Sequence, residues 1–246
     1  MIIGSSVRRC EKVSSTNSVA VAMLRESKPQ EGTVITASFQ DSGRGQAGNS
    51  WESEPGSNVL MSVILYPVMV KPAEQFVISQ MVSLAVHDLV ATHTPEARIK
   101  WPNDIYVRDD KIAGILIENT IMGNTLSSTV AGIGLNVNQT VFRSGAPNPV
   151  SLAHITGSDH DLASVTGELT SLLDSRYAMI IRGETAALAK DYHEVLYRSG
   201  EWHRFTGSGG EFEGMIERVR PDGMLLVRLR DGKREEYAFK EIDYIL

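Results

Sequence analysis

Apolar residues follow two different patterns along the chain, and the change falls near residue 199. Upstream, apolar runs typical of strands occur at 8–13, 33–39, 59–66, 98–107, 111–118 and 127–137. Between and after these runs, apolar residues recur with the period of a helix. They predict one helix that ends near Pro29, one that begins at Pro72, one that begins after Asp161, and one from about 184 to 197. Downstream, short alternating strands are predicted at 202–205, 212–219, 224–229 and 234–239.

Two details of this pattern refine the predicted architecture. The run 59–66 is almost continuously apolar, which indicates a strand buried on both faces. Pro102 divides 98–107 into two short strands, because proline removes a ladder donor and bends the chain, and 111–118 then returns as a hairpin. We therefore predict an α+β domain at 1–198, with a mixed sheet backed by helices, and a small β-barrel domain at 199–246.

Composition narrows the class of protein. The chain has 246 residues, of which 42% are hydrophobic and 22% charged, enough for one large core and a small appendage. Its net charge of -6 argues against nonspecific binding to DNA. The sequence has no apolar run near the roughly 20 residues of a membrane span and no secretory signal, and its single cysteine, Cys10, excludes an internal disulfide. We expect a cytoplasmic protein without membrane or DNA partners.

The first candidate site is the glycine-rich stretch 43–51. Its three glycines let backbone N–H groups approach an anion, Arg44 adds a fixed positive charge, and Trp51 offers a flat face for a purine. The stretch lacks the Lys and Ser/Thr of a Walker loop, and no helix pattern follows it as in a dinucleotide fingerprint. An ordinary surface loop is the alternative. Because strand-like segments flank 40–58 closely, we expect a lid over a ligand.

The second candidate site is the hairpin that contains Lys100, Trp101, Pro102, Asn103 and Asp104 and continues to Lys111. It combines two cations, a carboxylate and a bend. The alternative interpretation has both lysines solvated and Asp104 stabilising the bend. Similarly, the polar run 14–17 either caps the first helix or holds a small polar ligand at its start.

Together these motifs resemble those of the biotin protein ligases. The resemblance covers nearly the whole chain, through the motifs STN at 15–17, GRGQAG at 43–48, KWPND at 100–104, KIAGILIE at 111–118 and GIGLNVN at 132–138, together with Gln40 and Trp51. It implies the class II aminoacyl-tRNA synthetase-like catalytic fold followed by an SH3-like barrel. Because the first strand begins within the opening residues, the chain is expected to be a short form without the DNA-binding domain of some members.

The resemblance also implies a reaction. Biotin and ATP would give biotinyl-5'-AMP, and biotin would then pass to a lysine of a biotin carboxyl carrier protein or domain. Arg44 and Lys111 match the family's cationic contacts to the biotin carboxylate and the adenylate phosphate. Asp104 is the candidate that orients or deprotonates the carrier lysine. These three are the predicted catalytic residues.

The binding residues follow from the same resemblance. Those expected to contact biotin are Ser15, Thr16, Asn17, Gln40, Arg44, Gly45, Gln46, Lys111 and Gly114. Those expected to contact the nucleotide are Trp51, Asn136, Lys100 and Asn103. Mg²⁺ is expected with ATP, without assigned ligands. One departure is Gln46, where well-known members carry a second arginine that helps to retain the adenylate, so we expect adenylate leakage.

Alternatives remain open at this point. A lipoate or octanoate ligase shares the fold and the adenylate chemistry, although the KWPND and GRGQAG motifs favour biotin. A non-catalytic sensor of biotin or its adenylate would not need Lys111 and Asp104. A purely structural α/β domain would require both motif clusters to be coincidental. The sequence is compatible with both a monomer and a homodimer.

Overall fold

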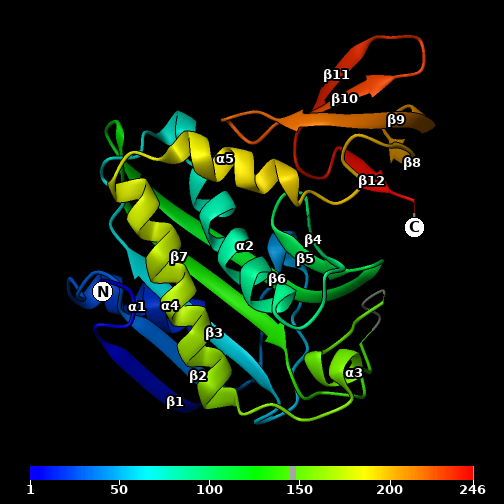
Figure 1. Cartoon of the computed structure of the whole chain (residues 1–246). Coiled ribbons are helices and arrows are strands. Elements are labelled where there is room, and N and C mark those ends of the chain that lie inside the picture. Colours follow the sequence, from blue (N-terminus) through cyan, green and yellow to red (C-terminus); the bar gives the residue numbers. More distant parts are fainter. Residues whose placement is uncertain (145–147, 246) are drawn as a thin grey trace.

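A seven-stranded mixed sheet lies at the centre of the computed structural model, which describes residues 1–144 and 148–245 (Figure 1). Its strand order is β1-β2-β3-β7-β6-β5-β4. β1 and β2 are parallel, and the other neighbours are antiparallel. The strands are β1 (Val7–Val13), β2 (Val34–Gln40), β3 (Asn58–Leu65), β4 (Ala97–Lys100), β5 (Asp104–Val107), β6 (Asp110–Met122) and β7 (Thr125–Asn136).

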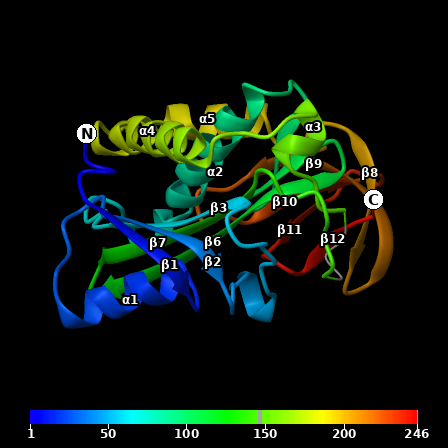
Figure 2. The ribbon, with the colours of Figure 1, turned by 90° about the horizontal axis from the view of Figure 1, so that it is seen from below.

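Helices cover both faces of this sheet, as Figure 2 shows. α1 (Thr16–Glu26) connects β1 to β2 and packs on one face, against β2, β3 and β7. α2 (Phe76–Ala91) and α4 (Leu162–Ile181) cover the opposite face, and α5 (Thr185–Glu194) packs against both. All eight residues of β3 are buried between these layers, so the predicted two-sided burial is confirmed.

A second, five-stranded antiparallel sheet follows. It has the order β11-β10-β9-β8-β12, from the strands β8 (Trp202–Gly207), β9 (Gly210–Val219), β10 (Leu225–Leu229), β11 (Arg234–Tyr237) and β12 (Ile242–Tyr244). This arrangement fits the expected SH3-like domain, but the described residues form no ladder between the edge strands β11 and β12. The sheet is therefore not closed along this edge of the predicted SH3-like barrel.

Some element boundaries differ from the sequence-based prediction, and tertiary contacts explain the clearest case. The helix predicted to run to 197 ends at Glu194, because the following residues hydrogen-bond to the edge strand β4: Ile99 N donates to Val195 O, and Tyr197 N to Ile99 O. At Pro72 the chain forms a short 3₁₀ turn (Pro72–Glu74) before α2. The short α3 (Leu152–Thr156) and the last strand, β12, were not individually predicted.

Candidate active site

Residues from both sequence motifs line one cavity on the α1 face of the central sheet. The predicted site residues that line it are Ser15, Thr16, Asn17, Gln40, Arg44, Gly45, Gln46, Trp51, Asp104, Lys111 and Gly114. They come from the start of α1, the end of β2, the glycine-rich loop, the β4–β5 hairpin and β6. The fold thus brings together segments up to about a hundred positions apart in the sequence.

Three glycines form the floor of the cavity. Gly114 and Gly134 are direct partners across β6 and β7. A Cβ on Gly134 would stand 2.4 Å from Cε2 of Trp51, and one on Gly114 would stand 2.8 Å from its Cζ3. A Cβ on Gly132 would lie 2.1 Å from Oδ1 of Asn17. Because no side chain fits at these positions, the indole and the Asn17 amide can lie directly against the sheet.

The start of α1 supplies the polar wall. Ser15 is the N-cap residue, but its side chain makes no capping hydrogen bond. Instead, Gln40 Oε1 accepts from the backbone N–H of Thr16 at 2.7 Å. The hydroxyl of Ser62 donates to Asn17 Oδ1 at 2.6 Å and lies 2.7 Å from Thr16 Oγ1. Gln40 therefore accepts from the N–H group at the helix start, and Ser62 bonds to the side chains of Thr16 and Asn17. The Ser15 hydroxyl, which does not cap the helix, is left available to a ligand.

Ser62 was missed by sequence reasoning, although a signal was present. It interrupts the otherwise apolar run of β3, and its side chain is fully buried. A buried hydroxyl requires a partner, and here the partners are two of the predicted biotin contacts.

The glycine-rich loop borders the cavity, and residues 41–57 are called the lid below, after the role predicted for them. Within it, Gly45 N donates to Asn49 O at 2.6 Å, and Trp51 N donates to Gly43 O at 2.9 Å. These bonds close a small hairpin, and Gly48 at its tip has a φ of +90°, a conformation that glycine adopts readily. The lid places Arg44, Gln46 and Trp51 on the cavity wall.

Arg44 forms an ion pair with Glu118 of β6. Its Nη2 is 2.9 Å from Oε1 of Glu118, and its Nη1 is 3.3 Å from Oε2. The same Oε2 accepts from Nδ2 of Asn17 at 2.8 Å. Glu118 therefore connects the lid to the polar wall. Glu118 is part of the KIAGILIE motif, but the sequence indicated no role for it, because its pairing with Arg44 joins segments that are far apart along the chain.

Lys111 and Asp104 form the second ion pair of the cavity, with Nζ and Oδ2 2.6 Å apart. The two side chains are 31% and 29% exposed, so this pair remains accessible from the cavity. Together with Arg44, the site therefore presents two cations, each paired with a carboxylate. An arriving anionic substrate can replace either carboxylate as the partner of a cation.

Three predicted residues lie outside the cavity wall. The Asn103 amide links the lid to α2, because its Oδ1 accepts from Gln46 at 3.0 Å and its Nδ2 donates to Ser79 at 3.3 Å. Nδ2 of Asn136 donates to Val150 O, while its Oδ1 is buried without a partner among the described residues. Lys100 points toward Tyr106, to which its Nζ donates at 3.3 Å.

The cavity is also lined by residues to which the sequence assigned no individual contact. Asn49 and Ser50 extend the polar surface of the lid, and Pro102 contributes from the hairpin. Phe239 comes from the turn between β11 and β12, and its ring centre lies 6.0 Å from that of Trp101. The C-terminal segment therefore takes part in building the site.

Comparison with known proteins identifies the family. Residues 10–136 match the model of the biotin/lipoate A/B protein ligase family. The biotin–[acetyl-CoA-carboxylase] ligase of Mycobacterium tuberculosis is 30% identical over 215 residues, covering 85% of this chain and 78% of that protein. The bifunctional ligase/repressor BirA of Bacillus spizizenii is 27% identical over 243 residues, covering 96% and 74%.

The fold agrees with these relatives. The biotin protein ligase of Aquifex aeolicus, solved in complex with biotin and ATP, superposes with a TM-score of 0.78 at 23% identity, over 97% of this chain and 98% of that one. The chain thus belongs to the biotin/lipoate A/B protein ligase family. It is a ligase, and the proteins from Mycobacterium tuberculosis and Aquifex aeolicus carry the names of biotin ligases, which confirms the resemblance found in the sequence.

Two absences can be stated for the described residues. Within 1–144 and 148–245, no helix is both long and apolar enough to cross a membrane. In the same ranges, no three His, Cys, Asp or Glu side chains gather closely enough to hold a metal ion.

Proposed function

We propose that this chain activates biotin with ATP, forming biotinyl-5'-AMP and pyrophosphate, and transfers biotin to a specific lysine of a biotin carboxyl carrier protein. The observation that carries the proposal is the joint placement of Arg44, Lys111 and Asp104 around one cavity with the polar start of α1 and the indole of Trp51. The names of the relatives supply the substrate, and the chemistry of the cavity is suited to it.

Adenylate formation brings two anions together. An oxygen of the biotin carboxylate attacks the α-phosphorus of ATP, and the bond from that phosphorus to the pyrophosphate oxygen breaks. Arg44 and Lys111 lower the repulsion by exchanging their present partners, Glu118 and Asp104, for the substrate anions. Catalysis then rests on positioning and charge, because this step needs no covalent enzyme intermediate.

Transfer requires a neutral amine. The lysine of the carrier has an ordinary pKa of about 10.4, so its ammonium must lose a proton before the nitrogen can attack. Asp104 lines the cavity and takes or directs that proton. The nitrogen then attacks the anhydride carbonyl, the C–N bond forms, the C–O bond to phosphate breaks, and AMP leaves while the amide nitrogen loses its second proton.

The nucleotide is expected on the lid side of the cavity. Nε1 of Trp51 and Oδ1 of Asn136 are buried and have no hydrogen-bond partner among the described residues. Such groups are costly to bury unless a ligand satisfies them. We propose that Asn136 Oδ1 accepts from adenine and that the indole face stacks on its ring, which leaves Trp51 Nε1 at the indole edge to donate to another atom of the ligand. Mg²⁺ would enter with ATP, whose phosphates supply much of its coordination.

The test is a biotinylation assay read by mass spectrometry. The protein is incubated with biotin, Mg²⁺, ATP and a carrier domain, and a control carrier has its target lysine replaced by arginine. We expect one biotinyl group on the intact carrier and none on the control. Preferential addition of lipoate or octanoate in competition would assign the chain to the lipoate branch, and biotin binding without turnover would indicate a sensor.

A further inference from the structure

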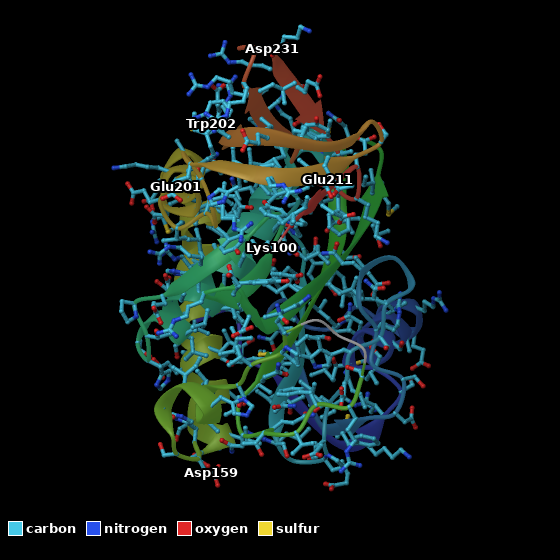
Figure 3. The ribbon with its side chains drawn as sticks, turned by 90° about the vertical axis from the view of Figure 1, so that its right-hand side faces the viewer. Lys100, Asp159, Glu201, Trp202, Glu211 and Asp231 are labelled. Atoms are coloured by element: carbon cyan, nitrogen blue, oxygen red, sulfur yellow. The ribbon has the colours of Figure 1, made fainter. Side chains whose placement is uncertain are left out.

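Lys100 is held at the junction of the two sheets. Its Nζ lies 4.7 Å from the ring centre of Tyr106 and 4.9 Å from that of Tyr244. It also donates to the Tyr106 hydroxyl at 3.3 Å. Tyr244 belongs to β12, the last strand of the chain, and Figure 3 shows Lys100 beneath the C-terminal sheet. Contact with two aromatic faces fixes the ammonium more firmly than a surface lysine is fixed.

The charges around Lys100 connect it to the proposed chemistry. Lys100 is the direct partner of Asp104 in the β4–β5 ladder. Burial lowers the pKa of Lys100, while the carboxylates of Asp104 and Asp243 favour its charged form. Lys111 and Arg198 disfavour the charged form. Asp104 therefore forms an ion pair with Lys111 on the cavity side, and it lies within electrostatic range of the Lys100 ammonium, its ladder partner on the side of the C-terminal sheet.

These two lysines differ in their freedom to respond to a substrate. Lys111 lines the cavity, and in the proposed function it turns to the anion of the adenylate. Its pairing with Asp104 is then weakened when Asp104 is needed by the carrier lysine. Lys100 does not line the cavity, and its aromatic contacts hold it in place. It can remain beside Asp104 throughout the reaction.

We propose that Lys100 is a positioning residue for the transfer step: its ammonium, clamped between Tyr106 and Tyr244, holds the Asp104 carboxylate oriented toward the incoming carrier lysine. The inference rests on the proposed biotin ligation. It assigns Lys100 to the second half-reaction, in place of the nucleotide contact that the sequence suggested. It also makes β12 a functional part of the site, since Tyr244 supplies one side of the clamp.

The test separates the two half-reactions. Transfer is measured in a single turnover from preformed biotinyl-AMP to the carrier, and activation is measured by ATP–pyrophosphate exchange. For Lys100→Met we expect transfer to slow by tenfold or more at neutral pH, with exchange within about twofold of wild type, since the variant retains Arg44 and Lys111. The KM for the carrier should change less than kcat. Lys100→Arg should restore most of the transfer rate.

Tyr244 provides a matched pair of variants. Tyr244→Phe keeps the ring and should leave transfer unchanged, whereas Tyr244→Leu removes one face of the clamp and should slow transfer with exchange preserved.

Equal loss of exchange and transfer in Lys100→Met would assign Lys100 to the nucleotide and overturn the proposal. A normal transfer rate in Lys100→Met would overturn it as well. If Lys100→Met does not fold, Lys100→Arg and the Tyr244 pair decide by the same criteria. Absence of both activities in wild type would instead refute the proposed function.

Discussion

Gly132→Ala tests how closely the polar wall fits the sheet. The new methyl carbon would lie 2.1 Å from Asn17 Oδ1, whereas Cβ contacts shorter than 3.0 Å are essentially never observed. The Asn17 side chain must therefore move by about an ångström. That movement breaks its hydrogen bonds with Ser62 at 2.6 Å and with Glu118 at 2.8 Å.

The cost can be worked out from these two bonds. The bond to Ser62 is neutral, worth about 1 kcal/mol, and the bond to the Glu118 carboxylate is worth about 1.5–3 kcal/mol. Replacing a strand glycine by alanine returns about 0.5–1 kcal/mol through the unfolded state. We expect a net loss of roughly 2 kcal/mol in the free energy of unfolding, which lowers the Tm by about 4–8 °C for a chain of this size.

The measurement combines thermal unfolding with biotin titration. Because Asn17 is a proposed biotin contact, we expect the Kd for biotin to rise by about 10–100-fold in Gly132→Ala. The control is Gly167→Ala in α4, where no atom lies within 4 Å of the added Cβ. That variant should be as stable as wild type or slightly more so, and it should bind biotin normally. A Gly132→Ala protein with unchanged Tm and unchanged biotin affinity would refute the reasoning.

Three further predictions follow from the site and the core. Lys111→Ala should lower ATP–pyrophosphate exchange by about 100-fold or more, because it removes one preorganised charge. Asp104→Ala should instead slow transfer to the carrier and leave exchange nearly intact. If Lys111→Ala impaired only transfer and Asp104→Ala impaired exchange, both roles would be refuted. Gln46→Arg should slow the release of free biotinyl-AMP by roughly tenfold, because a charge-assisted bond to the adenylate replaces a neutral one. An unchanged release rate would show that position 46 does not retain the adenylate. Burial acts to raise the pKa of Asp88, but hydrogen bonds from His87 and Arg176 lower it on balance. This carboxylate therefore stabilises the fold above its unfolded pKa of about 3.9, and the contribution is lost as pH falls through the lower folded pKa. Asp88→Asn should flatten the acid side of a urea-midpoint profile between pH 3 and 7, and an unaltered profile would contradict this.

Local sequence signals predicted the elements of this fold well where burial and turns determine them. The apolar run of β3, the break at Pro102 and the capping by Asp161 all appear in the structure, the last as a bond from Ser164 N to the Asp161 carboxylate. The motifs also predicted most of the cavity wall, because each motif lies at a strand or helix end that faces the same space.

The remaining features depend on contacts between distant segments. Lys100 and Tyr244 are 144 positions apart, and nothing near Lys100 indicates that its ammonium lies against β12. The pairing of Arg44 with Glu118 likewise depends on how the lid folds over β6. Periodicity predicts which residues form a strand, but the direction of a long charged side chain is decided by its neighbours in the assembled fold.

The shared core of the two sheets has a consequence for how the protein unfolds. Phe205, Val219 and Leu225 of the C-terminal sheet belong to the same buried cluster as α2 and β3, and Trp101 Nε1 donates to Gly223 O at 3.0 Å. Cutting the chain near residue 199 would therefore expose apolar surface on both fragments. We expect the two sheets to melt in a single calorimetric transition, and neither fragment to persist alone after limited proteolysis.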